Sequence, residues 1–231
     1  MDTLTPLPLA YCLRVWIRQI SPMIWRRLLL RGDHTLADLH YTLQIAFGWS
    51  DEHLHRFLLH GREYGIPRAG GPWYTGDARE VRLDDLGLRL SERFVYEYDF
   101  FDHWHHEIRV EQIGPLDAAT SYPVCTAGRR AGPPEECGGP RAYLEQRQRY
   151  TLGYLARRIG LILDPETDVE TIARCRAEVA QAEPWLDAER LDRRTINRRL
   201  RQYAAGDARW RGEVVLADGD VADGHVYKEG P

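Results

Sequence analysis

The chain has 231 residues, of which 43% are hydrophobic, with seven Trp, twelve Tyr and a formal net charge of −4. This apolar content excludes a wholly disordered protein and predicts one domain with an appendage or two small domains. The negative net charge gives the whole protein no electrostatic reason to bind nucleic acid or an anionic membrane, so such binding requires a local basic patch.

The sequence predicts a cytoplasmic protein with no membrane partner. Residues 1–10 lack the basic and apolar regions of a signal peptide. No apolar stretch approaches the ~20 residues that are needed to span a bilayer. The cysteines are scattered along the chain, which favours free or metal-ligating thiols in a reducing compartment; they are Cys12, Cys125, Cys137 and Cys175.

The first predicted elements are a β-hairpin and a helix. Apolar and polar residues alternate over 11–18 and again over 24–30, which predicts two paired strands. Thr35 is the predicted N-cap of the helix, and Asp38 completes an imperfect capping box. Gly48 stands where a left-handed C-terminal cap is expected. The apolar stripe of this helix is expected to pack on the hairpin, its only early partner.

Further along the chain, alternation predicts three more strands, over 53–59, 94–101 and 104–113. Segments rich in Gly and Pro, 65–80 and 115–140, are predicted to be loops and turns. After residue 141 the pattern becomes helical, with apolar stripes over 168–182 and 188–203.

Strands followed by helices predict an α+β domain over about residues 8–204. We expect a mostly antiparallel or mixed sheet, one helix packed on it early and helices at the C-terminus, an order compatible with a β-grasp-like half-barrel. The Gly- and Asp-rich remainder, 205–231, is expected to be loosely held, with room for a short strand at 214–216.

Several sequence blocks occur together in a recognisable order: 22–27 (PMIWRR), 35–40 (TLADLH), 47–57, 94–100, 122–125, 133–139 (PPEECGG) and 185–200. Over about residues 10–203 these blocks resemble the Ri-plasmid ORF-3-like family, also described as an insertion-sequence passenger family. The resemblance implies an association with plasmids and mobile genetic elements and no particular reaction. Where the family often has a cysteine before the two prolines, this chain has Gly132, which removes a thiolate from any metal site that relatives carry.

Two predicted strands place acidic residues and histidines near one another. If Asp102 and His103 form a two-residue hairpin loop, Asp99 lies directly opposite His106, close enough for a carboxylate to orient an imidazole. A loop one residue earlier sets Glu97 against His106 instead. A structural role is the competing interpretation, because aspartates at a hairpin tip often satisfy turn backbone groups.

These residues and their neighbours define a candidate polar site, which comprises His53, His55, Asp99, Asp102, Trp104, His106, Glu135 and Glu136. A divalent metal such as zinc would use the N, O and S donors of His53, His55, Asp99, His106, Cys125 and Cys137. The spacing of these donors matches no tight metal motif. His40 lies beside the apolar stripe of its helix and is predicted to be a hydrogen-bonded core residue.

The last predicted helix is locally basic, with eight Arg and three acidic residues between 188 and 211. Its candidate contacts to a phosphate backbone are Arg190, Arg194, Arg198 and Arg201. No helix-turn-helix, zinc-finger or RNA-binding motif accompanies them, and a solvated face of an amphipathic helix explains the same pattern.

The leading functional hypothesis is a non-enzymatic binding or accessory module, linked to mobile genetic elements through the resemblance, with a protein or small molecule as its partner. The first alternative is a metal-dependent hydrolase-like enzyme that uses His53, His55, Asp99, Asp102 and His106. The second is weak nucleic-acid binding through the C-terminal arginines.

Overall fold

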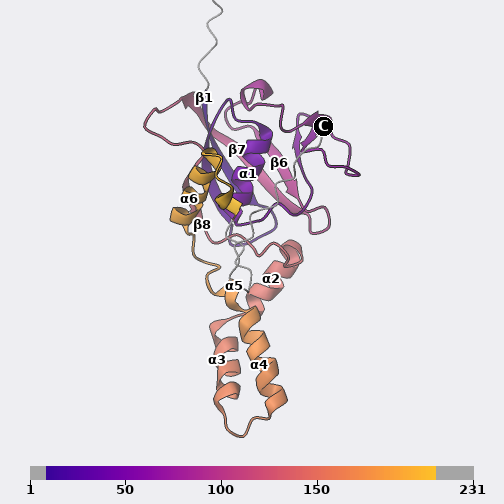
Figure 1. Cartoon of the computed structure of the whole chain (residues 1–231), viewed down its shortest axis with the longest axis vertical. Coiled ribbons are helices and arrows are strands. Elements are labelled where there is room, and N and C mark those ends of the chain that lie inside the picture. The colour runs from indigo at the N-terminus through magenta and orange to yellow at the C-terminus, as the bar shows by residue number, and fades with distance from the viewer. Residues whose placement is uncertain (1–8, 212–231) are drawn as a thin grey trace, which may run out of the picture.

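The computed structural model of the chain describes residues 9–211 (Figure 1). They form a large β-sheet with one helix packed on a face of it, and a helical hairpin projects from one end of the molecule. The strand expected at 214–216 and most of the predicted tail, 205–231, lie outside the described residues. The domain boundary at 204 stays a prediction.

The sheet has eight strands in the order β5-β4-β3-β6-β7-β1-β2-β8 within the described part of the chain. Neighbouring strands are antiparallel except β4 and β5, which are parallel. The α+β class and the mixed sheet are therefore confirmed, and so is the first hairpin, since β1 pairs with β2. The strands are β1 (Leu9–Ile17), β2 (Trp25–Arg31), β3 (His55–Leu59), β4 (Arg62–Gly65), β5 (Gly76–Asp77), β6 (Arg93–Tyr98), β7 (Trp104–Pro115) and β8 (Val124–Arg129).

Helix α1 (Leu36–Phe47) begins and ends where the local signals predict. Thr35 Oγ1 accepts the Asp38 N–H at 3.1 Å, and the Asp38 carboxylate accepts the Thr35 N–H at 2.7 Å, so the capping box is complete. Gly48 ends the helix with a φ of 85°, a conformation that residues with a Cβ rarely adopt. The buried side of α1 covers the inner face of the sheet.

The two faces of the sheet differ because successive side chains of a strand point to opposite sides. The inner face, beneath α1, is built from aliphatic and aromatic residues and forms the core, including Leu13, Val15, Leu28, Phe57, Tyr96, Trp104 and Ile108. The outer face is polar and carries cross-strand ion pairs such as Arg27–Glu111 at 2.6 Å and Arg18–Glu107 at 3.0 Å. Antiparallel sheets commonly have one face packed against the core and one face exposed to solvent.

The helices of the C-terminal part are α2 (Gly139–Arg149), α3 (Leu152–Leu163), α4 (Val169–Gln181), α5 (Glu183–Leu186) and α6 (Arg193–Ala204). Two short 3₁₀ helices also occur, η1 (Asp84–Leu86) before β6 and η2 (Ala208–Arg211) after α6. α3 and α4 form the projecting hairpin, whereas α6 returns to the sheet (Figure 1). The last helix begins at Arg193 rather than at the predicted 188, because the Asp192 carboxylate caps it by accepting the Thr195 N–H at 3.0 Å.

One strand lies inside the segment 115–140, which the sequence predicts to consist of turns. This strand, β8, pairs with β2 at the edge of the sheet. The side chain of Asn197 in α6 holds it, because its amide oxygen accepts the Cys125 N–H at 2.8 Å and its amide nitrogen donates to the Cys125 carbonyl at 3.0 Å. The two residues are 72 positions apart, so the short local pattern does not reveal the strand.

The hairpin between β6 and β7 differs from both predicted registers. Tyr98 lies opposite Trp104 and Tyr96 opposite His106, so neither Asp99 nor Glu97 faces His106. The turn starts at Asp99, which has a φ of 55° and accepts the Phe101 N–H at 2.9 Å with its carboxylate. The carboxylate thereby stabilises a longer turn than the two-residue loops that the sequence suggested.

Candidate functional site

The predicted polar site divides between the core and one end of the sheet. His55 and His106 lie on the inner face, with exposed fractions of 1% and 0%, and Trp104 is also fully buried. The His106 ring contacts Phe47 and Trp49 edge to face, with centroids 4.7 and 5.1 Å away. These three predicted site residues are therefore part of the packed core.

The other predicted residues do come together, in what we call the polar end cluster: His53, Asp99, Asp102, Glu135 and Glu136. The His53 Nε2 atom lies 2.6 Å from Glu136 Oε1, and its Nδ1 atom lies 3.7 Å from Asp99 Oδ2. The Asp102 carboxylate accepts the Gly138 N–H at 3.1 Å. Glu136 and Asp99 thus lie on either side of His53.

Glu135 is held more tightly than its partner glutamate. Its carboxylate accepts both the N–H of Ser50 at 2.8 Å and the Ser50 hydroxyl at 2.6 Å, and it also accepts the hydroxyl of Tyr98. Glu136 is exposed and contacts only His53 among the interactions of the described residues. Glu135 therefore joins two loops, while Glu136 and His53 stay accessible to water.

The pKa shifts in the polar end cluster arise because several carboxylates lie close together. Burial disfavours the charged form of His53, but the hydrogen bond to Glu136 and the nearby Asp99 outweigh it and raise its pKa. Partial burial and the charge of Asp99 raise the pKa of Asp102. The cluster therefore favours a protonated histidine among acidic groups, which is the character of an ion-pair network.

The two cysteines proposed as metal ligands are buried apart from the histidines. Cys125 Sγ donates to the Ala127 carbonyl at 3.4 Å. Burial and the nearby Asp102 raise the pKa of Cys137 to about 12, which opposes the thiolate that a metal requires. Within residues 9–211, donor atoms converge in two groups, His40–Asp51–His55 and Glu97–His103–His105, and neither is the predicted set.

Gly132, the position where relatives often carry a cysteine, runs against the end of α1. A Cβ atom at this position would stand 1.9 Å from the Phe47 carbonyl oxygen. Glycine allows this close approach between two backbone segments, and no side chain fits there in this chain.

His40 is indeed a hydrogen-bonded core residue, and it belongs to the first convergent group. Its Nδ1 atom lies 2.8 Å from the Tyr96 hydroxyl, and its Nε2 atom lies 2.8 Å from Asp51 Oδ1. Arg68 donates to the same Asp51 oxygen at 3.0 Å. The His55 ring stacks on His40, with centroids 3.6 Å apart and planes 10° from parallel. Both histidines are almost completely buried and the hydrogen bonds of His40 are made inside the protein, so this group is a structural network.

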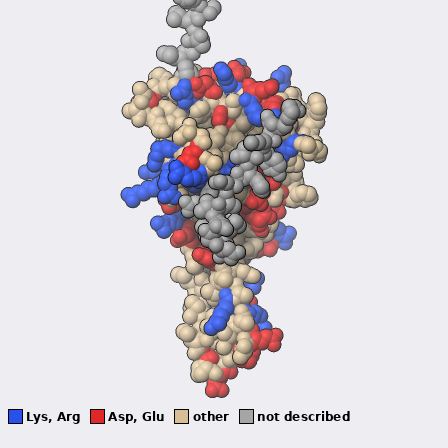
Figure 2. All heavy atoms as spheres, viewed as in Figure 1, with Lys and Arg blue, Asp and Glu red and all other residues tan. Residues whose placement is uncertain are grey.

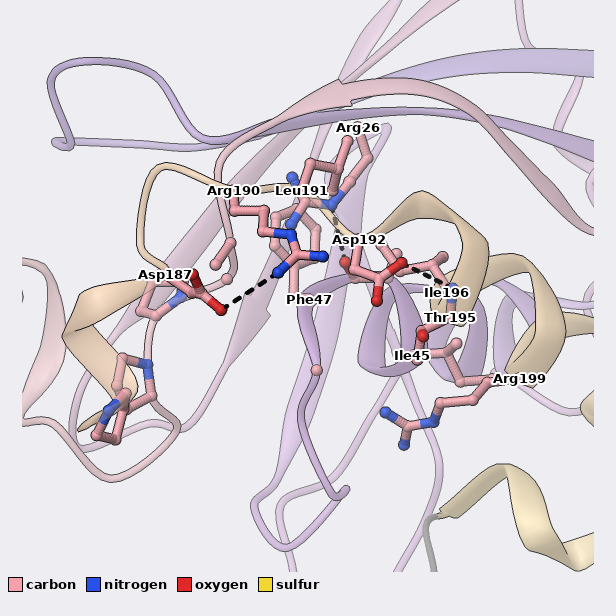
Figure 3. A pocket seen from close by; sticks show the side chains of 17 residues that line it. Arg26, Ile45, Phe47, Asp187, Arg190, Leu191, Asp192, Thr195, Ile196 and Arg199 are labelled. Atoms are coloured by element: carbon pink, nitrogen blue, oxygen red, sulfur yellow. Dashed lines mark hydrogen bonds and ion pairs between the residues drawn. The ribbon is translucent and has the colours of Figure 1, made fainter.

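A pocket of about 380 Å³ opens between the end of α1, the segment 131–134 and the α5–α6 region (Figure 3). Its walls are mixed, and Ile45, Phe47, Pro133, Leu191 and Ile196 are among the apolar lining residues. Three arginines, Arg26, Arg190 and Arg199, and two aspartates, Asp187 and Asp192, also line it. An apolar cavity with a few charged groups is the usual form of a small-molecule site.

Arg26 is the unusual member of this lining because it is 1% exposed. Its Nε atom donates to the Ala46 carbonyl at 2.8 Å, and its Nη1 atom donates to the carbonyls of Trp25 and Arg129 at 2.9 and 3.1 Å. No carboxylate pairs with it among the described residues. Burial lowers the pKa of Arg26 to about 10, so the side chain still carries its charge at neutral pH.

The other two arginines surround the opening of the pocket. Arg190 lies 3.7 Å from Asp187, and both side chains are mostly exposed. Arg199 donates through Nε to the Trp210 carbonyl at 2.6 Å. Burial and the nearby Arg198 lower the pKa of Arg199. Figure 3 shows these side chains around the same hollow as Arg26.

Sequence reasoning missed this pocket, although one signal was present. Arg26 shares a strand face with Leu28 and Leu30, so it occupies a core position of the hairpin. A charged residue at such a position needs a partner, because burial of an unpaired charge is costly. The sequence predicts a phosphate contact for Arg190, and it predicts no functional site that includes Arg199.

The arginines predicted to contact nucleic acid are exposed on α6 and at its start. Arg194, Arg198 and Arg201 follow one another at intervals of four and three, so they lie on one side of the helix. No ion pair joins them to a carboxylate among the described residues. Figure 2 shows basic side chains gathered on the side of the molecule where α6 lies.

The family model for plasmid pRiA4b ORF-3-like proteins matches residues 9–151. The chain belongs to this family. The family resemblance inferred from the sequence blocks is therefore confirmed over residues 9–151.

A protein sequence and a crystal structure are both similar to this chain. Over 139 residues the chain is 34% identical to the uncharacterized protein y4hQ of Sinorhizobium fredii (strain NBRC 101917 / NGR234), a match that covers 58% of this chain and 69% of y4hQ. It is also similar to the crystal structure of a protein of unknown function, MM3350 from Methanosarcina mazei Go1. That match has a TM-score of 0.59 and 28% identity, and it covers 81% of this chain and 97% of the other.

Within residues 9–211, no helix combines the length and the apolar character that crossing a bilayer requires. The cytoplasmic location stays a prediction.

Proposed function

We propose that this protein is a binding module and that its pocket beside Arg26 takes a small amphipathic anion. The ligand would carry a carboxylate, sulfonate or phosphate group on an apolar body. The family name, which refers to a plasmid gene, supports an accessory role in mobile genetic elements as part of the same proposal.

The observation that carries the proposal is the buried guanidinium of Arg26. Buried charges in proteins are normally paired, because desolvation of an isolated charge costs several kcal/mol. Within residues 9–211 the hydrogen bonds of Arg26 go to backbone carbonyls and no carboxylate forms an ion pair with it, although Asp187 and Asp192 line the same pocket. An anion in the pocket supplies the missing countercharge, and the apolar walls contact the rest of the ligand.

A fluorescent aromatic sulfonate, anilinonaphthalene sulfonate, is a suitable probe of this pocket. We expect saturable binding that Arg190→Gln and Arg199→Gln each weaken by at least about tenfold, the loss typical of a hydrogen bond to a charged group. Arg194→Gln is the matched control, because it removes the same charge from the same region outside the pocket. Titration by fluorescence measures the dissociation constants.

The Arg26→Met variant adds a test of the buried cation itself and is checked for folding by circular dichroism. Equal affinity of the wild-type protein and the two pocket variants would contradict the proposal. An equal loss in the Arg194→Gln control would show that surface charge, rather than the pocket, attracts the probe.

A second candidate function is nucleic-acid binding through α6, which the unpaired arginines favour. Arg194, Arg198 and Arg201 present three exposed guanidinium groups along one side of the helix. The spacing suits contacts to successive phosphates of one backbone, which would position the protein without reading the base sequence.

Binding through these three arginines would depend steeply on salt. With three phosphate contacts, the affinity for a fluorescent duplex is expected to fall about 40-fold between about 50 and about 200 mM salt. Charge reversal of Arg194, Arg198 and Arg201 to Glu is expected to abolish this binding in a fluorescence anisotropy titration. The control reverses Arg157, Arg174 and Arg176 of the projecting hairpin, which changes the net charge equally. Equal loss in both variants would argue against a site on α6.

The metal-dependent hydrolase alternative has less support. It needs His53, His55, Asp99, Asp102 and His106 to meet around one cavity. His55 and His106 are core residues on the inner face, while His53 and the two aspartates belong to the polar end cluster. A binding module requires no such convergence.

A further inference from the structure

We propose that Glu97, His103 and His105 form a binding site for a divalent transition-metal ion such as Zn²⁺ on the outer face of the sheet. The site is distinct from the pocket and from the polar end cluster. Both histidines converge on one carboxylate oxygen: His103 Nδ1 lies 2.9 Å and His105 Nε2 lies 3.4 Å from Glu97 Oε1.

The distances from the two histidines to Glu97 are close to the donor separations of a metal site. Donor atoms that each lie ~2.1 Å from one metal ion are separated by about 3.0 Å at octahedral angles and about 3.4 Å at tetrahedral angles. The two N···O separations, 2.9 and 3.4 Å, are close to these values. The two imidazole rings lie 8° from parallel with centroids 6.0 Å apart, so an ion that replaces the shared protons also requires the exposed His103 ring to turn toward it. Two imidazoles and one carboxylate are a donor set that suits zinc and other first-row transition metals.

The strands hold two of the three ligands in place. Glu97 of β6 lies directly opposite His105 of β7, so their side chains project from the same face of the sheet. The Glu97 side chain is only 3% exposed, and Arg56 of β3 donates to its other oxygen, Oε2, at 2.7 Å. Arg56 therefore orients the carboxylate and leaves Oε1 for the histidines, while its charge moderates the affinity for a cation.

The turn between β6 and β7 supplies the third ligand. His103 has a φ of 52°, and its N–H donates to the Asp99 carbonyl at 2.7 Å, which fixes the backbone at the end of the turn. Its side chain reaches back to Glu97 although it is 61% exposed to water. This exposure gives an ion access to the site and leaves coordination positions open for water or an added ligand.

The first convergent group, His40–Asp51–His55, is less suited to a metal ion. Its two histidines are 0% and 1% exposed and their rings stack with centroids 3.6 Å apart, so an ion has no open path to their nitrogens. Both nitrogens of His40 already have hydrogen-bond partners, and the Asp51 carboxylate is paired with Arg68. In the outer-face group both histidine nitrogens approach the same Glu97 oxygen, and the His103 side chain is 61% exposed to solvent.

The test is a calorimetric titration of the untagged, metal-free protein with Zn²⁺ at neutral pH. We expect about one ion per chain, and affinities at least about tenfold weaker for His103→Ala and for His105→Ala. His60→Ala is the matched control: His60 is also an exposed histidine that pairs with a glutamate, Glu92, but it has no second histidine beside it in the described structure. Thermal unfolding in the absence of zinc checks that each variant keeps its fold.

Three outcomes would overturn the assignment. One is a wild-type protein that binds no Zn²⁺, and another is an affinity that neither His103→Ala nor His105→Ala changes. The third is a loss of binding in His53→Ala with none in His103→Ala, which would move the ion to the polar end cluster. Binding that the His103 and His105 variants weaken, and that His60→Ala leaves intact, supports the site.

Discussion

Replacing His106 with leucine is expected to make the loss in free energy of unfolding between about pH 7.5 and about pH 5 smaller by about 2 kcal/mol. Complete burial, with the nearby charges of His105 and Arg26 acting in the same direction, lowers the pKa of His106 to about 3. The unfolded chain binds a proton at its ordinary pKa near 6.5, while the folded protein stays unprotonated there until about pH 3. As the pH falls through this window, the unfolded state binds more protons and the folded state loses stability.

The leucine variant removes this proton uptake and, with it, an unpaired buried nitrogen. Among the described residues the Nε2 atom of His106 has no hydrogen-bond partner, and its Nδ1 atom lies 3.1 Å from the Trp104 carbonyl oxygen. The leucine substitution is therefore expected to change the free energy of unfolding little at neutral pH, because a buried polar group without a partner is itself unfavourable. Urea unfolding at the two pH values gives the free energies of unfolding.

The contribution of His106 is separable from that of the other histidines. His40 is equally buried, with a pKa also lowered to about 3 by burial, so the variant keeps part of the wild-type acid sensitivity. His53→Gln is the control and is expected to increase the loss of stability in acid. His53 has a raised pKa, so its protonated form stabilises the folded state at low pH. The same loss of stability on acidification in wild type and His106→Leu would contradict the assignment of His106 as a neutral core residue.

Replacing Trp49 with alanine is expected to lower the free energy of unfolding by about 3–5 kcal/mol, the cost of deleting a large buried aromatic side chain. Trp49 is 1% exposed, and its ring stacks on Tyr98 at a centroid distance of 5.1 Å. Its Nε1–H donates to the Pro133 carbonyl at 2.9 Å, which ties the pocket segment 131–134 to the core. The substitution therefore opens a cavity and releases one wall of the pocket.

Two further variants separate these effects when urea unfolding is measured. Trp49→Phe keeps most of the packing and loses the hydrogen bond to Pro133, which is expected to cost about 1 kcal/mol. Trp73→Ala is the control, because Trp73 is 94% exposed and its removal is expected to change stability by no more than about 0.5 kcal/mol. A cost below about 1 kcal/mol for Trp49→Ala would show that the core does not depend on this residue.

Elements defined by neighbouring residues were predictable from the sequence. The ends of α1 depend on Thr35, Asp38 and Gly48, whose contacts with the helix backbone span a few positions. The hairpin of β1 and β2 follows from two alternating runs that are close together in the chain. The blocks that resemble the family also lie in order along the sequence, so the family identity needed no coordinates.

The candidate sites were only partly predictable, because they depend on register and on residues far apart in the chain. The Asp99 carboxylate accepts the Phe101 N–H in a turn that is longer than predicted, and in the observed β6–β7 register His105, rather than His106, lies beside Glu97. The polar end cluster was foreseen in part, since Glu136 and Asp99 do flank His53.

The sequence by itself determined the α+β class, the capped first helix and the family, because those signals are local periodicities, caps and ordered motifs. The tertiary structure alone decided that Arg26 lines a pocket formed with α5 and α6, that His40 stacks on His55, and that β8 joins the sheet. Each of these rests on contacts between segments distant in the sequence, which packing and cross-strand register determine and which no local pattern encodes.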